Sequence, residues 1–409
     1  MNSLKVVLQK STIQLFLWMV VVLLLTRQVP FSSFSFISNI AILILVLYSL
    51  SRKKEVFFEY GVILLWLVLL VAYSIVSQNN LSYIIRFGII CLLIPLSYYV
   101  KLPIKSINIL FFFVTIQCLF ITFIELYLLF FQSIESYFPI RFFFNEKEWG
   151  DIYTYSGYYY FIQLKGNALI PFAYMLTFIF PFKSNKSKWI LRIIFLSGTL
   201  IAGNFAFFIS LFCFHFVKYI NINGLSKNKA AIRIITLCFI LLITSSIIFS
   251  YVENVMDRKQ DNSLSTRTDQ FHVLMNDVQE NTLTILFGQG LGHTISEKTM
   301  YRDYTDNVYY ELQIVYFFNQ LGILNFLIFI ALNFYLTIKY IPQKNLLWIY
   351  ICYVLYAVTN PYILDTNHIV VIICLVSLNN FPHMDKWKEI YPKRELHGNE
   401  RDEIKLPTI

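Results

Sequence analysis

The sequence predicts an all-α, polytopic integral membrane protein with about twelve transmembrane helices, and two observations carry this prediction. Hydrophobic residues make up 57% of the 409 residues and charged residues only 14%, with a mean hydropathy of +0.61. The interior of a soluble domain is too small to hold that much apolar surface, whereas lipid solvates it. The apolar residues also fall in runs of roughly 16 to 25, the length of one helical pass through hydrocarbon, without the alternation typical of barrel strands.

The expected transmembrane helices follow one another along most of the chain. They are predicted near 11–28, 36–51, 57–77, 82–100, 106–131, 167–182, 189–203, 205–220, 233–252, 321–340, 345–359 and 368–382. Only Gly203 and Asn204 separate the two spans between 189 and 220, so one re-entrant unit is the alternative interpretation of that segment. Residues 1–383 therefore form a single transmembrane domain, and a charged tail follows over 384–409.

Lysine and arginine indicate which ends of the spans face the cytoplasm. They precede the first span and recur in every second loop, at Lys5 and Lys10, 52–54, Lys101 and Lys105, 183–188, 218–233, Lys339 and Lys344, and along the tail. The positive-inside rule then places both termini in the cytoplasm. The net charge of +9 is thus mostly a topology signal, and the basic residues form no single patch for nucleic acid.

The remaining composition excludes several kinds of site. The N-terminal apolar stretch is interpreted as a retained first helix, because no small-residue cleavage site follows it. All six cysteines fall within predicted spans, so no disulfide framework is expected. No metal or cofactor is expected either, since no Cys/His spacing suggests zinc and there is no Asp-x-Asp motif.

Two long polar loops, near 133–166 and 253–306, are predicted on the outward face. Loops of this length on a membrane protein are more often functional than mere connections. The second loop contains the start of an amphipathic helix near Thr266 and then a glycine-rich turn over 287–292. A turn is the safer interpretation of these glycines, because no strand and Walker lysine accompany them.

The polar residues on this face suit chemistry on a lipid pyrophosphate, because the planar fork of arginine binds phosphate oxygens bidentately. The candidates for substrate binding are Arg86, Arg141, Lys165, Arg267, Arg302 and Asn307. The candidates for a general base are His293, directly after the glycine turn, and Glu311 on the following helix.

Simpler interpretations stand beside these. The loop arginines are also explained as solvated or lipid-binding charges, and a lone loop histidine is often incidental. Arg86, within the fourth span, is expected to face a cavity or a partner such as Glu125. Asp365 and His368 lie at the last outward turn, within reach of a bound substrate.

The order of these features resembles the superfamily of O-antigen polymerases and O-antigen ligases. The matching segments are Lys165-Gly166-Asn167-Ala168, Arg267, the turn at 287–292, Asp306-Asn307 with the helix 308–320, Leu321-Gly322 and Thr359-Asn360-Pro361-Tyr362. Ligases usually have a His-Asn pair where this chain has Asp306-Asn307, which favours a polymerase. The Arg-x10-Gly pattern of some polymerases is missing from both loops.

The resemblance implies a GT-C-like bundle in the bacterial inner membrane, with its active face in the periplasm. It implies a glycosyltransferase without cofactor, which moves a growing surface polysaccharide from undecaprenyl pyrophosphate to a lipid-linked repeat unit. The partners implied are that lipid-linked oligosaccharide, membrane lipid, a chain-length regulator and a flippase, and no nucleic acid. The alternatives are an O-antigen ligase that joins glycan to the lipid A core, and a lipid-linked oligosaccharide flippase or transporter. Against transport, the two halves show no convincing repeat.

Overall fold

The computed structural model describes residues 2–51, 57–131, 137–154, 159–220, 265–300, 302–306, 308 and 310–380. The chain is mostly helical, and within these described ranges three helices are long and apolar enough to cross a membrane: α3 (Phe57–Val76), α5 (Lys105–Phe131) and α13 (Gln313–Tyr340). Shorter apolar stretches lie in α1 (Asn2–Leu25), where they cover Thr12–Leu25, and in α2 (Ser35–Ser51), α4 (Leu81–Ser97), α9 (Phe205–Ile220), α14 (Lys344–Val358) and α15 (Thr366–Asn379). This helical architecture agrees with the predicted all-α membrane protein.

Helix α3 illustrates why the bundle requires an apolar solvent. Val62, Leu65 and Leu69 share one face of the helix and are 48%, 62% and 62% exposed. Ile63 and Leu70 point the other way and are buried in the bundle. An amphipathic helix of a soluble protein would carry polar residues on its exposed face. The outer face of α3 is apolar instead, as expected for a helix in contact with lipid.

The segment expected as the sixth span is a much shorter helix than predicted. Helix α7 covers only Leu169–Leu176, and tight turns continue the chain through Phe180. Eight residues span only about 12 Å. Every residue of α7 is buried, and the helix packs against α5, α8 (Asn185–Ala202), α9 and α14. Its apolar sequence therefore reflects burial among helices, which demands the same composition as contact with lipid.

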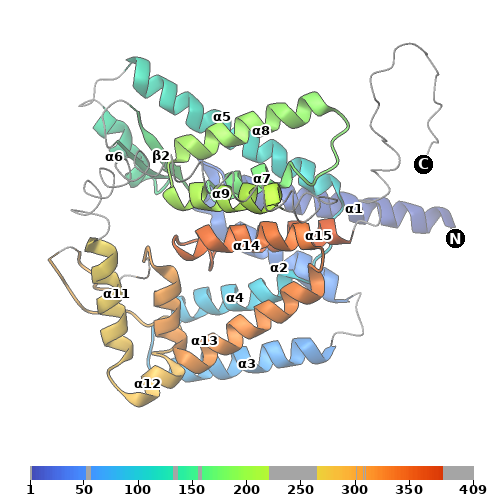
Figure 1. Ribbon diagram of the computed structural model, residues 1–409. Helices are drawn as coiled ribbons and strands as arrows, with labels where there is room; N and C mark the ends of the chain where they lie inside the picture. The colour runs from blue at the N-terminus through green and yellow to red at the C-terminus, as the bar shows by residue number, and fades with distance from the viewer. Residues whose placement is uncertain are drawn as a thin grey trace, which may run out of the picture.

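The segment 189–220, the weakest part of the predicted topology, consists of two helices, α8 and α9. Helix α8 ends at Gly203, whose φ of 63° is a left-handed cap, and a Cβ there would meet the ring of Phe161. α8 packs on α5 and α7, whereas α9 packs on α14, and the two helices run in opposite directions (Figure 1). Two antiparallel helices fit both two passes and one re-entrant hairpin, so the choice between them stays a prediction. The span expected near 233–252 lies outside the described residues.

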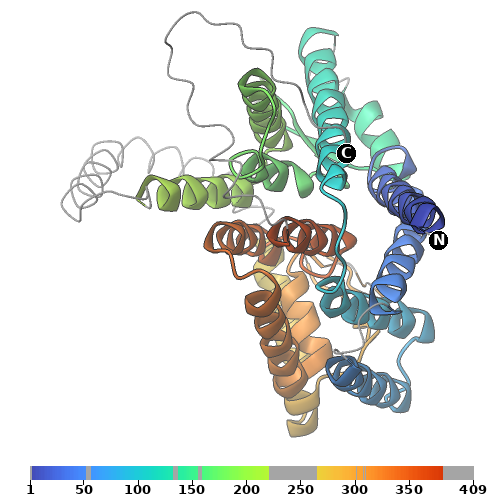
Figure 2. The ribbon, with the colours of Figure 1, turned by 90° about the vertical axis from the view of Figure 1, so that its right-hand side faces the viewer.

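Helices α14 and α15 form the centre of the molecule. Figure 2 shows them between α5, α7, α8 and α9 on one side and α3, α4 and α13 on the other. Helix α15 is buried from Thr366 to Leu378, with contacts to α4, α7 and α14. An all-round apolar helix belongs in the interior, and here the last described helix occupies it.

Both polar loops lie at one end of the bundle, opposite the start of α1 (Figure 1). The first loop contains α6 (Phe138–Glu146) and a hairpin of β1 (Gly150–Tyr153) and β2 (Phe161–Leu164), paired antiparallel with Gly150 opposite Leu164. The second contains α11 (Ser265–Val278) and α12 (Thr282–Phe287). The chain also forms one short 3-10 helix, η1 (Phe31–Phe34), after α1. The shared position of the two loops agrees with the sequence prediction.

Candidate functional site

The glycine turn after α12 is fastened to α11 and to α13 by a small polar network. His293 Nε2 lies 3.1 Å from a carboxylate oxygen of Asp277, which ends α11. The other carboxylate oxygen of Asp277 accepts a hydrogen bond from Asn319 on α13 at 2.7 Å. The hydroxyl of Tyr316 donates to the carbonyl of His293, also at 2.7 Å. The network therefore fixes the position and the ring orientation of His293.

Glycines allow the close approach of this turn to α13. Gly288, Gly290 and Gly292 all have positive φ, as the predicted turn requires. A Cβ on Gly288 would lie 2.2 Å from the carbonyl oxygen of Gln320. On the opposite side, Gly322 is non-helical and breaks α13 just after the polar segment. The helix predicted over 308–320 thus begins at Gln313 and ends at this break.

Three tyrosines form a buried stack beside His293. The ring centroids of Tyr304 and Tyr310 are 5.8 Å apart, and those of Tyr310 and Tyr316 are 4.5 Å apart. Burial raises the pKa of Tyr304, and its hydrogen bond to Asp269 raises this pKa further. Burial also raises the pKa of Tyr310, whose hydroxyl makes no hydrogen bond to any described residue. The stack is therefore an uncharged aromatic part of the protein interior next to the turn.

Two of the predicted arginines flank this stack. Arg302 lies within electrostatic range of Tyr304 and Tyr310, and Arg86 lies within electrostatic range of Tyr316. Among the described residues, no carboxylate pairs with either guanidinium. Arg86 is exposed on α4, with its guanidinium carbon 6.0 Å from the ring centroid of Phe87. Both arginines thus remain available to an anionic ligand.

Arg86 does not form the ion pair with Glu125 that the sequence suggested. Glu125 is buried on α5 and accepts a hydrogen bond from the backbone N–H of Tyr160 at 3.0 Å. Glu125 therefore holds the end of the hairpin connection, directly before β2, against α5. The two side chains lie on helices that belong to different halves of the bundle (Figure 1).

Arg267 and Glu311 are brought together, which links a predicted phosphate ligand to a predicted base. Arg267 Nε donates to a carboxylate oxygen of Glu311 at 2.9 Å, and both side chains are about one-third exposed. This hydrogen bond occupies a lone pair of the carboxylate that a general base would need. His293 is therefore the stronger candidate for the base.

Arg141 and Lys165 belong to the hairpin and not to the tyrosine stack. Arg141 on α6 forms a bidentate pair with Asp151 at 2.7 and 2.9 Å, and these hydrogen bonds raise the pKa of the arginine. Lys165 lies 3.6 Å from Glu148. The arginines expected around one pyrophosphate are thus divided between two loops, and Asn307 lies outside the described residues.

A buried ion pair at the same end of the bundle escaped the sequence analysis. Arg27, at the end of α1, donates to both carboxylate oxygens of Asp365 at 2.8 and 2.7 Å, and to the side chain of Asn367 at 3.3 Å. In the sequence, the signal that could have marked Arg27 is a single charged residue at the end of an apolar span. His368 is also buried, with hydrogen bonds to Tyr350 and to the carbonyl of Ile363. The expectation that a bound substrate reaches His368 is therefore wrong.

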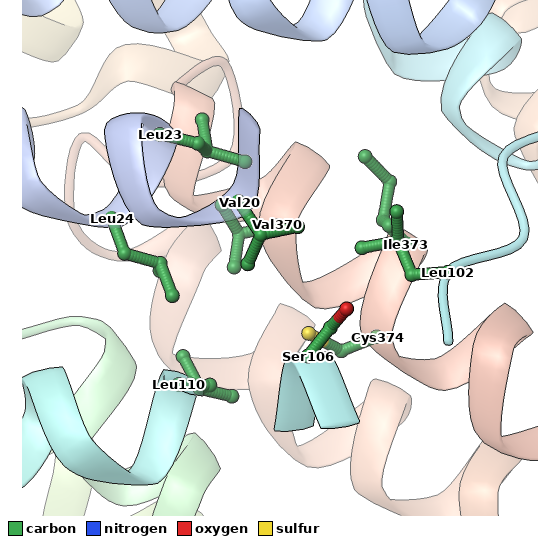
Figure 3. Close-up of a pocket in the computed structure, with 9 residues that line it drawn as sticks. All are labelled: Val20, Leu23, Leu24, Leu102, Ser106, Leu110, Val370, Ile373 and Cys374. Carbon is green, nitrogen blue, oxygen red and sulfur yellow. The ribbon is translucent and has the colours of Figure 1, made fainter. Parts of the chain in front are cut away.

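Other parts of the described chain offer no rival site. The small cavity in Figure 3 is lined almost entirely by apolar side chains from α1, α5 and α15, with Ser106 as the hydroxyl among them. Such a surface suits a packing defect better than a sugar or a phosphate. The described residues contain no cluster of three or more His, Cys, Asp or Glu side chains suited to a metal.

The arrangement around His293 has the parts of a proton-transfer site for an anionic substrate. When Nε2–H donates to Asp277, Nδ1 of His293 is left to accept a proton. Arg86 and Arg302 supply positive charge, and the buried Tyr316 supports the turn through its hydrogen bond to His293. In comparisons with known proteins, no family model, no curated protein and no solved structure matches this chain.

Proposed function

We propose that this chain is a polymerase of O-antigen or a related surface polysaccharide. It spans the bacterial inner membrane about twelve times, with both termini in the cytoplasm and the polar loops in the periplasm. It transfers the growing glycan from undecaprenyl pyrophosphate to a lipid-linked repeat unit, alongside a flippase and a chain-length regulator. The common position of both polar loops at one end of the bundle supports this orientation.

The observation that carries the proposal is the pairing of His293 with Asp277, near two arginines that form no ion pair with any described carboxylate. A carboxylate that orients an imidazole is the arrangement of a general base. Unpaired guanidinium groups at the outer end of a membrane bundle suit a lipid-linked phosphate. A transporter would be expected to hold its polar groups near the middle of the membrane.

The proposed reaction uses these groups in one displacement. The acceptor hydroxyl oxygen attacks the anomeric carbon of the donor glycan, and the bond from that carbon to the pyrophosphate oxygen breaks. The hydroxyl proton passes to Nδ1 of His293, and undecaprenyl pyrophosphate leaves. Arg86 and Arg302 stabilise the negative charge that develops on the leaving group, while the pair of Arg267 and Glu311 keeps α11 against the start of α13.

Deletion of the gene tests the proposal, with surface polysaccharide separated on gels. A polymerase predicts that the deletion strain retains single repeat units on the cell surface and loses the long chains. Long chains that accumulate without attachment to the lipid A core would identify a ligase instead. Repeat units trapped on the cytoplasmic face would identify a flippase, and an unchanged ladder would falsify all three assignments.

A further inference from the structure

Three cationic side chains converge at the end of the bundle opposite the tyrosine stack. Arg192 on α8 places its guanidinium carbon 3.7 Å from the ring centroid of Phe178. Lys218, at the end of α9, places its ammonium nitrogen 3.6 Å from the same centroid. Lys188, in the first turn of α8, is within electrostatic range of both. Three positively charged side chains therefore lie close to the ring of Phe178.

No carboxylate among the described residues balances this cluster. Within the described ranges, none of the three cations has an ion pair with Asp or Glu. Arg192 is only 9% exposed, and its hydrogen bonds go to the neutral hydroxyl and carbonyl oxygens of Thr177. His215 and Tyr174 also face the cluster, and they are hydrogen-bonded to each other at 2.9 Å. Buried charge without a counter-charge is costly, and like charges at this range repel.

The surroundings indicate what kind of anion would relieve that cost. The first turn of α8 contains no acidic residue, and the helix dipole favours negative charge there, although Ser184 already caps the N–H of Lys186. Next to Lys188 and Arg192, the outward-facing side chains are apolar: Trp189 is 61% and Ile193 is 66% exposed. A ligand at this place meets positive charge at the helix ends and an apolar surface along the helix.

We propose that Lys188, Arg192 and Lys218 bind the phosphate of an anionic phospholipid, whose acyl chains lie along α8. The site is at the bundle end where α1 begins (Figure 1), so it is separate from the proposed polymerase site and does not depend on it. Long basic side chains that merely extend to the headgroup region do not explain this cluster, because Arg192 is buried in the protein. Basic pockets between transmembrane helices are a recurrent way of holding such headgroups.

Equilibrium binding of fluorescent phosphatidylglycerol to the purified full-length protein in neutral detergent tests this site. We expect phosphatidylglycerol to bind more tightly than phosphatidylcholine. Each of Lys188→Gln and Lys218→Gln should weaken its binding about fivefold. Lys186→Gln is the matched control, because this lysine of the same helix turn is exposed and outside the cluster, and it should bind like the unaltered protein.

Three results would overturn the proposal. The first is undiminished lipid binding by the double variant Lys188→Gln/Lys218→Gln. The second is an equal loss in Lys186→Gln, which would indicate general surface charge. The third is displacement of the lipid by millimolar inorganic phosphate, which would identify a soluble anion as the occupant. Circular dichroism and gel filtration of each variant establish that the fold is intact.

Discussion

At the scale of single residues, His293 is the side chain on which the proposed chemistry depends. Its imidazole is held by Asp277 through Nε2, so the role of a base falls to Nδ1. General base catalysis contributes about 10²- to 10⁴-fold to a rate. We therefore expect His293→Ala to reduce the rate of glycan polymerisation by about that factor, measured with purified protein and lipid-linked repeat units.

A second histidine provides the control for this prediction. His272 lies on α11, is exposed, and has no contact with the polar network of the turn. His272→Ala should polymerise at the rate of the unaltered protein. If His293→Ala retains full activity while remaining folded, the histidine only fastens the turn, and the base must be sought elsewhere.

At the scale of elements, the break of α13 at Gly322 shapes the site, because it brings the helix against the glycine turn. Gly322 has a φ of 64°, and a Cβ there would lie 2.2 Å from the backbone nitrogen of Gly288. A non-glycine residue in the left-handed region costs about 1–2 kcal/mol even without a clash. Gly322→Ala should therefore lower the thermal unfolding temperature in detergent.

The control is Gly61 in α3, where a Cβ would meet no atom within 4 Å. Alanine is preferred over glycine in a helix by up to about 1 kcal/mol, so Gly61→Ala should keep or raise the unfolding temperature. An equal, small effect of the two substitutions would mean that the close approach of α13 and the turn contributes little to stability.

At the scale of the whole molecule, the pair of Arg27 and Asp365 joins the first helix to the last described one. Removing one member of a buried ion pair costs about 3–5 kcal/mol, because it leaves an uncompensated charge. Asp365→Asn should therefore lower the unfolding temperature strongly. Replacing both residues with apolar ones, in Arg27→Met/Asp365→Leu, should recover much of that loss.

The exposed pair of Lys165 and Glu148 serves as the comparison. Glu148 is 82% exposed at its side chain, and surface pairs contribute about 0–1 kcal/mol. Glu148→Gln should leave the unfolding temperature nearly unchanged. If Asp365→Asn is equally harmless, Arg27 must be stabilised by other groups, and the pair does not hold the bundle together.

The helices were predictable because contact with lipid imposes long apolar runs, and most predicted spans on described residues coincide with helices. The exception, α7, shows the limit of that argument, since burial among helices selects the same side chains. The site was predictable only in parts. Arg86, His293 and Arg302 were named as separate candidates, but their grouping around the tyrosine stack depends on contacts between distant segments. The ion pair of Arg27 and Asp365 joins residues 338 positions apart, so no local pattern announces it.

The central place of α15 has a consequence for biosynthesis. The helix that fills the interior is synthesised after α1 and after every described helix that surrounds it. Until Asp365 has been synthesised, Arg27 lacks the carboxylate with which it pairs in the folded protein. The helices made earlier must therefore leave the place of α15 between them unfilled until this helix is added. Chains truncated before residue 365 should therefore lack both the interior helix and the partner of Arg27, and should be less stable than the full chain.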